Sequence, residues 1–399
     1  MKAGDAKGAA PFLRPLMICC LVTFACYLGT SMRFPLVPLY ARSLGISTVV
    51  IGFISSAYFL FAGLFSFPMG MLSDRHGRKP LAAAGLLLLS AGTLLLCVGT
   101  TGPQLMAMYL LLGLGMAAFG PPMMSYLAEI SPRSHLGRSY GWYTTALFAG
   151  MSVGPATGGM LAQQMGFKPV FALSAGCLLV TLAVLVVFLP GAPAPRPGGL
   201  RTGERGVFRR LWKNRPYVGC LLVALGGAFS SGLFFTFVPL LARDRGLNVR
   251  QIGVVFLVQA LCNALSRIPM GYFSDRSGRR NHFVITGGLC TALSIFGFGL
   301  AQHMGHFLAA AAALGVSMGM AFTSVGALIA ECVPPFMRGL AMGGYNTGIY
   351  FGMMTSAGVM GSVIQSVDFR TAFTLTAATT ACLTGGFAWL ARRYAPAAG

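Results

Sequence analysis

The chain has 399 residues, of which 55% are hydrophobic and only 9% are charged, and its mean hydropathy is +0.73. Because soluble domains carry about 25% charged residues, this composition excludes an ordinary soluble protein and predicts an all-α membrane protein. The formal net charge of +21 does not indicate a nucleic-acid partner, since the basic residues stand in short segments between long apolar runs.

Twelve apolar stretches are each long enough to cross a bilayer, which takes about 20 residues. They form two groups of six, separated by a stretch rich in Pro, Gly and Arg that reads as a linker. The expected domains are a six-helix bundle at 1–190, a cytoplasmic linker at 191–215 and a second six-helix bundle at 216–399. The predicted spans cover residues 15–40, 49–70, 80–99, 104–128, 139–163, 168–190, 216–241, 249–271, 282–302, 306–330, 338–365 and 369–391.

A short polar motif follows the second span and is repeated after the eighth. Residues 70–80 read GMLSDRHGRKP and residues 271–281 read GYFSDRSGRRN, an offset of 201, and the identities continue upstream at the same offset. Further along, Leu127-Ala-Glu129 is echoed by Ile329-Ala-Glu331 at an offset of 202. The chain therefore consists of two related halves, and a substrate cavity is expected between them near the middle of the membrane.

The two motifs, the spacing of the spans and the chain length resemble the major facilitator superfamily, and within it the twelve-span drug/proton antiporter branch. The resemblance covers nearly the whole chain and implies two pseudo-symmetric six-helix bundles that rock about a central site. It also implies that the loop motif latches the outward-facing state, with its arginines paired to carboxylates at neighbouring helix ends. The residues expected to act in this latch are Gly70, Asp74, Arg75, Arg78, Glu129, Asp275, Arg276, Arg279 and Glu331. The alternative is a loop that only anchors the chain on the positively charged side.

The fifth span carries a second motif, which matches the antiporter signature of the same family. Its residues are Gly141, Gly150, Gly154, Pro155, Gly158 and Gly159. Glycines at this spacing make a smooth face that lets helices approach closely, and the proline permits a bend. The resemblance implies export, whereas the alternative is generic packing of small residues. The second half has Ser356 and Ala357 in place of Gly154 and Pro155.

Two features of many antiporters are missing. Tyr109 stands where the family's fourth-span motif has an arginine, and Gly29 lies where drug exporters place a first-span acid. All eight acidic residues fall in loops or at span ends: Asp5, Asp74, Glu129, Glu204, Asp244, Asp275, Glu331 and Asp368. Proton coupling through a central carboxylate is therefore not supported, which leaves Glu129, Glu331 or Asp244 as coupling groups.

Arg33 is a charge placed deep in a predicted span, about 18 residues into the first one. Such an arginine normally faces a cavity or a partner. It could bind an anionic or carbonyl-bearing substrate, or it could reach the outer surface or backbone carbonyls. Arg267 is interpreted as an anchor at the cytoplasmic end of its span. Further substrate-binding candidates are polar residues within the spans: Tyr27, Tyr58, Tyr143, Gln259, Asn263, Tyr345, Asn346 and Tyr350.

The distribution of Lys and Arg predicts the orientation. With the N-terminus inside, one face collects 21 basic residues and the other six, so both termini should be cytoplasmic, in a bacterial inner membrane. The sequence favours a monomeric transporter that exports an amphipathic or drug-like compound in exchange for protons, with no enzymatic activity, cofactor or metal. The alternatives are a facilitator or exchanger of a small organic anion that uses Arg33, and a transporter-like sensor that moves nothing.

Overall fold

The computed structural model describes residues 6–132, 135–191, 210–334 and 337–392, and within these ranges the long elements are all helices. The first half contains α1 (Ala6–Met32), α2 (Leu36–Ser43), α3 (Thr48–His76), α4 (Arg78–Leu95), α5 (Gly102–Ile130), α6 (Leu136–Met165) and α7 (Phe167–Phe188). The second contains α9 (Arg215–Asp244), α10 (Val249–Ser277), α11 (Arg280–Gly299), α12 (Met304–Cys332), α13 (Arg338–Ser366) and α14 (Phe369–Arg392). Most of the predicted linker lies outside the described residues.

Each predicted span coincides with a helix, α1 and α2 together forming the first. Nine of the described helical segments are long and apolar enough to cross a membrane: α1 with α2, α3, α5, α7 and α9 to α13. The less apolar α4, α6 and α14 pack among them. The prediction of an all-α membrane fold built from two six-helix bundles is confirmed.

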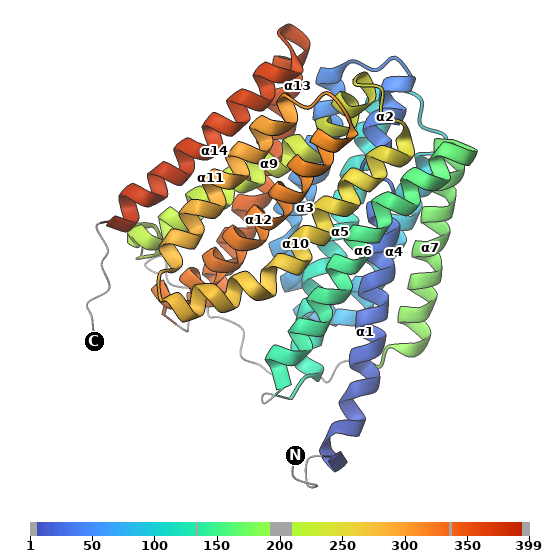
Figure 1. Cartoon of the computed structure of the whole chain (residues 1–399). Coiled ribbons are helices and arrows are strands. Elements are labelled where there is room, and N and C mark those ends of the chain that lie inside the picture. The colour runs from blue at the N-terminus through green and yellow to red at the C-terminus, as the bar shows by residue number, and fades with distance from the viewer. Residues whose placement is uncertain (1–5, 133–134, 192–209, 335–336, 393–399) are drawn as a thin grey trace.

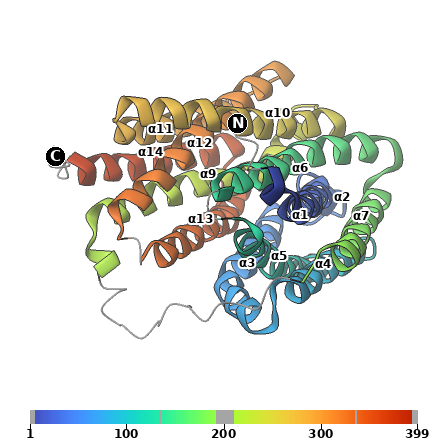
Figure 2. The same ribbon diagram turned by 90° about the horizontal axis from the view of Figure 1, so that it is seen from below.

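The two bundles repeat one packing scheme. In the first, α6 and α7 flank α1, and α5 lies against α3 and α4; in the second, α13 and α14 flank α9, and α12 lies against α10 and α11. The halves meet along two equivalent seams, α3 with α13 and α6 with α10 (Figures 1 and 2). We call the end with both polar motifs the motif side and the other end the opposite side. Figure 1 shows the bundles diverging towards the motif side.

The first span is broken, whereas a continuous helix was predicted. Residues 33–35 form a turn between α1 and α2, with the Leu36 N–H donating to the Arg33 carbonyl at 3.0 Å. Pro35, which has no N–H and constrains the residue before it, stands at the break. Its counterpart in the unbroken α9 is Thr236, while Pro38 and its counterpart Pro239 both lie inside helices. Pro35 therefore accounts for the asymmetry.

The polar motifs are largely helical, whereas loops were predicted. α3 continues through His76 and α4 begins at Arg78, so that Gly77 alone separates them, with φ of +94°. In the second half, α10 ends at Ser277 and Gly278 adopts φ of +62° before α11. Only glycine takes such angles without strain. Both helices extend beyond their apolar segments into the polar motifs, because the backbone hydrogen bonds of a helix do not depend on side-chain polarity.

The glycines of the fifth-span motif divide between two partners. A Cβ at Gly150 would lie 2.5 Å from the Phe24 carbonyl oxygen of α1, and one at Gly158 would collide with the Met32 carbonyl. Gly159 instead faces α10, where its Cβ would lie 2.7 Å from the Val249 carbonyl oxygen. The motif thus joins α6 to α1 within a half and to α10 across the halves.

The halves are joined on the opposite side. Arg42 and Asp244 form an ion pair of 3.1 Å between α2 and α9, and the Ser56 hydroxyl donates to the Met354 carbonyl at 2.6 Å between α3 and α13. On the motif side, by contrast, no described atom of another helix lies within 4 Å of a Cβ built at Gly70, Gly141 or Gly343. Gly70, one of the residues expected to act in the latch, therefore makes no close helix contact in this conformation.

We predict that Gly158→Ala destabilises the protein by about 1–3 kcal/mol, because overpacking against backbone cannot be relieved by a side-chain rotation. Gly141→Ala is the matched control on the same helix, since its methyl group meets open space. Thermal unfolding in detergent should show a lower Tm for Gly158→Ala only. Equal melting temperatures would contradict a packing role for this motif.

Candidate functional site between the halves

Two phenylalanines meet in the middle of the molecule. Phe34, in the turn after α1, and Phe235, in α9, occupy equivalent positions of the repeat and lie with their ring centroids 5.6 Å apart. Sequence reasoning missed this pair, although the offset of 201 between two identical residues is its signal. The pair marks the contact between the halves at the pseudo-twofold axis.

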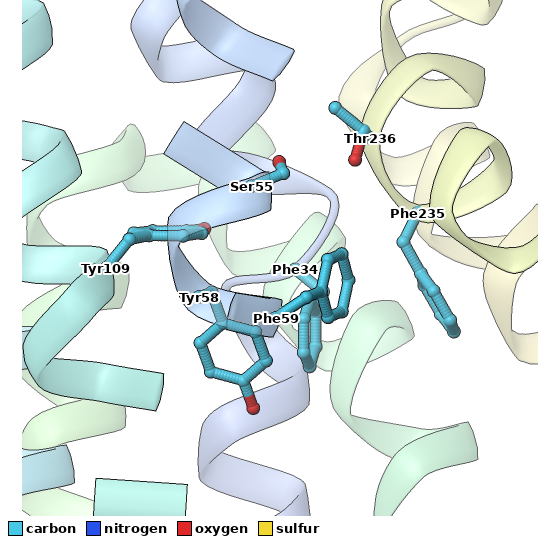
Figure 3. Close-up of a pocket in the computed structure, with 7 residues that line it drawn as sticks. All are labelled: Phe34, Ser55, Tyr58, Phe59, Tyr109, Phe235 and Thr236. Atoms are coloured by element: carbon cyan, nitrogen blue, oxygen red, sulfur yellow. The ribbon is translucent and has the colours of Figure 1, made fainter. Parts of the chain in front are cut away.

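A small pocket lies on one side of the Phe34–Phe235 pair, with a cavity volume of about 10 Å³, which is room for about one water molecule in this conformation. Its walls are α3 and α5 of the first half and α9 of the second, with the Phe34 ring between them (Figure 3). The lining residues are Phe34, Ser55, Tyr58, Phe59, Tyr109, Phe235 and Thr236. Four aromatic residues of the first half make this an apolar pocket with hydroxyl groups at its edges.

A second pocket, with a cavity volume of about 20 Å³, lies on the other side of the pair. It is lined by Ser31, Phe34, Met151, Pro155, Phe235, Phe256, Gln259 and Ala260. Its α10 residues, 256, 259 and 260, are the repeat counterparts of 55, 58 and 59 in the first pocket. The two pockets are therefore related by the pseudo-twofold symmetry, but Tyr58 in one is replaced by Gln259 in the other.

Arg33 is buried, with 1% of its surface exposed. Its guanidinium carbon lies 5.8 Å from the ring centroids of both Phe34 and Tyr58, a distance typical of cation–π contacts. Nε and Nη2 have no hydrogen-bond partner among the described residues. The buried hydroxyls of Ser31 and Thr236, one from each pocket lining, likewise lack a partner there. A cation and two hydroxyls at the pockets thus have unused hydrogen-bonding capacity.

The other predicted binding residues do not all share this site. Tyr143 is buried within the first half, where α6 packs on α1. Tyr345 is buried against Phe322 in the second half, with ring centroids 6.5 Å apart. Tyr350 lies on the α3–α13 seam, with its Cβ 2.7 Å from a Cβ built at Gly63. The half-buried Tyr27 packs against α6 at Gly150, and the exposed Asn346 lies one helical turn from Tyr350.

Arg267 is a residue whose position the sequence did not predict. Its Nε donates to the Asn263 side-chain oxygen at 3.0 Å, and its guanidinium carbon lies 4.1 Å from the Phe148 ring centroid of α6. Arg267 therefore contacts the other half across the α6–α10 seam, in contrast to the predicted anchor. The prediction placed the end of its span at residue 271, whereas α10 continues to Ser277.

The carboxylates of the described residues lie at helix ends, as expected. Arg78, the first residue of α4, forms ion pairs with Asp74 of α3 and with Glu129 of α5, the latter at 2.9 Å. Glu129 Oε2 is buried without a partner in the described structure. Arg75, which was also expected to pair, is exposed. Arg78 therefore holds the motif-side ends of three helices together.

In the second half the equivalent pairs are made by Arg280, whereas Arg279 was predicted. Arg280 pairs with Asp275 at 2.8 Å and with Glu331 at 3.0 Å. Arg279 precedes α11, because the turn at Gly278 is one residue longer than the turn at Gly77. This inserted residue explains why the repeat offset changes from 201 to 202, and it makes Arg280 the counterpart of Arg78.

Asp368 lies outside the spans, before α14, and caps that helix. Its carboxylate accepts the Thr371 N–H at 2.7 Å. Hydrogen bonds from Thr371 lower the pKa of Asp368, since they stabilise the ionised form. Asp368 therefore has a structural role at a helix N-terminus.

Two bundles related by a pseudo-twofold axis, with a pocket on each side of that axis, define a transporter fold. The family model described as Major Facilitator Superfamily matches residues 19–249 and 220–399. The chain therefore belongs to the major facilitator superfamily and is a multi-pass membrane transporter rather than an enzyme.

Similar proteins agree with this assignment. An uncharacterized MFS-type transporter of Methanocaldococcus jannaschii is 24% identical over 84% of this chain and 88% of its own length. The multidrug resistance protein MdtG of Proteus mirabilis is 27% identical over 90% of this chain and 92% of its own. Among solved structures, a bacterial homologue of the human lysosomal transporter Spinster, in an inward-facing and unoccupied conformation, superposes with a TM-score of 0.80 at 14% identity, over 98% of this chain and 100% of that one.

We predict that Arg280→Gln impairs transport more strongly than Arg279→Gln, because only Arg280 holds two carboxylates. The two substitutions remove the same charge from adjacent positions, so that Arg279→Gln controls for the local surface charge. Uptake or efflux by reconstituted protein would measure the effect, with unfolding temperature measured in parallel. If the two variants lose transport activity equally, the ion pairs of Arg280 are not required for transport.

Proposed function

We propose that this transporter exports small amphipathic compounds across a bacterial cytoplasmic membrane in exchange for protons. The observation that carries this proposal is the pair of small aromatic pockets, one on each side of the pseudo-twofold axis. Flexible Met and aromatic side chains in such pockets suit ligands that vary in shape. The similarity to a multidrug resistance protein supports export, and so does the close-packed face of the fifth-span motif.

The charge distribution supports a cytoplasmic motif side. Most Lys and Arg residues flank the helices there, as the positive-inside rule describes. In that orientation the ion pair between Arg42 and Asp244 closes the outer side, and the separation at Gly70 and Gly141 lies towards the cytoplasm. The structure would then correspond to an inward-facing state, ready to take substrate from the cell interior.

Protons would have to be carried by groups at the helix ends, since every carboxylate among the described residues lies there. Glu129 is the strongest candidate, because one of its oxygens is buried and free while the other pairs with Arg78. Glu331 pairs with Arg280, and Asp244 pairs with Arg42 across the halves. Each could change its pairing as the two bundles rock.

A second candidate function is a facilitator or exchanger of small organic anions. Arg33 favours it, since a buried guanidinium with free N–H groups is a ready partner for an oxyanion. An anion carrier of this kind would need no titratable carboxylate in the membrane. The two functions therefore differ in whether substrate movement is linked to proton movement.

Transport by proteoliposomes with an imposed pH gradient and an internal pH-sensitive dye would test the proposal. Lipophilic cations and aryl carboxylates, added separately, should trigger proton movement if the protein is an antiporter. Protein-free liposomes and Glu129→Gln protein serve as controls, and the variant should lose most of the signal if Glu129 carries the proton. Substrate flux that is indifferent to the gradient and lost in Arg33→Ala would contradict proton exchange and favour the anion facilitator.

A further inference from the structure

Three polar residues form a stripe along one face of α10. Gln259, Asn263 and Arg267 are four residues apart, so their side chains lie one above another on the same helix face. Gln259 lines the second pocket, and the stripe runs from there towards the motif side. It therefore leads from the centre of the molecule to the side on which the halves diverge.

The repeat provides an internal control for this stripe. The equivalent positions of α3 are Tyr58, Ala62 and Ser66, of which none is charged and one is alanine. Both helices make the same kinds of contact, α3 with α5 and α13, and α10 with α12 and α6. A requirement of the fold would be met by similar residues in both halves. The amide and guanidinium groups of α10 thus have a role that is specific to the second half and is not required by the shared fold.

The charge of Arg267 is not neutralised within the described structure. Its guanidinium donates to the side-chain oxygen of Asn263 and lies against the face of Phe148. The ion pairs of Arg42, Arg78 and Arg280 lie at helix ends, and none of them involves Arg267. An aromatic face attracts a cation but carries no net charge. A half-buried arginine in a membrane span normally faces a cavity or a charged partner, and here that partner is missing.

We propose that the Gln259–Asn263–Arg267 stripe binds the acidic head group of the transported compound, an organic anion with an apolar body. The guanidinium of Arg267 donates to the carboxylate, and the apolar body lies against Phe148 and Met151 of α6. Because α6 and α10 belong to different halves, a ligand placed there contacts both halves at once. This assignment rests on the proposed function, in which the space between the halves is the substrate path.

The test uses three compounds that share an apolar body and differ in charge: 2-naphthylacetate, 2-naphthylacetamide and 2-naphthylethylammonium. Binding to the full chain is measured by ligand-dependent thermal shift in phosphatidylcholine nanodiscs. The acid should bind more tightly than the amide and the ammonium compound. Arg267→Gln should weaken acid binding about 10- to 100-fold, as expected for the loss of a charge-assisted hydrogen bond, and leave amide binding unchanged.

Two further variants make the result specific. Arg250→Gln removes the same charge from the exposed opposite end of α10 and should bind the acid as the wild type does. Arg267→Lys keeps a cation and should retain part of the preference. Amide binding by each variant, together with its unfolding temperature without ligand, shows that the fold is intact.

Several outcomes would overturn the inference. The first is equal binding of acid and amide by the wild type, and the second is an acid preference that persists in Arg267→Gln. The third is loss of acid binding when phosphatidylglycerol is added, because an anionic lipid would then be the ligand of the stripe. If no naphthyl compound binds while lipophilic cations drive proton movement in the liposome assay, the proposed export function holds and the acid-binding site is wrong. If neither assay gives a signal, both proposals fail.

Discussion

The close approach of glycine-containing helices is the constraint on which the rest of the structure depends. Within a bilayer, helices gain little from hiding apolar surface from one another, so their association relies on tight packing of backbones. Gly158 against α1 holds a bundle together, while Gly159 against Gly253 joins the two bundles on the opposite side. The glycine contact between the bundles lies on the opposite side, whereas Gly70, Gly141 and Gly343 make no close helix contact on the motif side.

Comparison of the two halves distinguishes residues that the shared fold requires from residues that are specific to the candidate site. Residues shared by both halves, such as Phe34 and Phe235, lie on the axis and make the contact between bundles. Residues that differ, such as Arg33 opposite Phe234 and Arg267 opposite Ser66, carry the charges of the interior. The contact between the bundles is therefore symmetric, whereas the charged residues of the interior are not.

The sequence predicted the helices well, because hydropathy and length alone determine which segments can span a bilayer. It predicted the ion-pair partners less well. An alignment by identity favours Arg279, but one inserted residue at a turn makes Arg280 the equivalent of Arg78. The environment of Arg267 could not be predicted either. The polar end of α10 gives no hydropathy signal, so the span was predicted to end near Arg267, whereas the helix continues to Ser277.

The two interior arginines limit the mechanism that this fold can support. The described helices place no carboxylate near Arg33 or Arg267, and an arginine cannot lose its charge to relieve burial. In this conformation the described part of the interior therefore carries two positive charges that no carboxylate neutralises. An anionic ligand lowers the free energy of such a site, whereas a cationic one raises it. No carboxylate of the described residues lies beside the pockets, so a proton cannot be exchanged for the ligand there directly. A proton released at a distant helix end would have to be linked to ligand movement through the movement of the bundles.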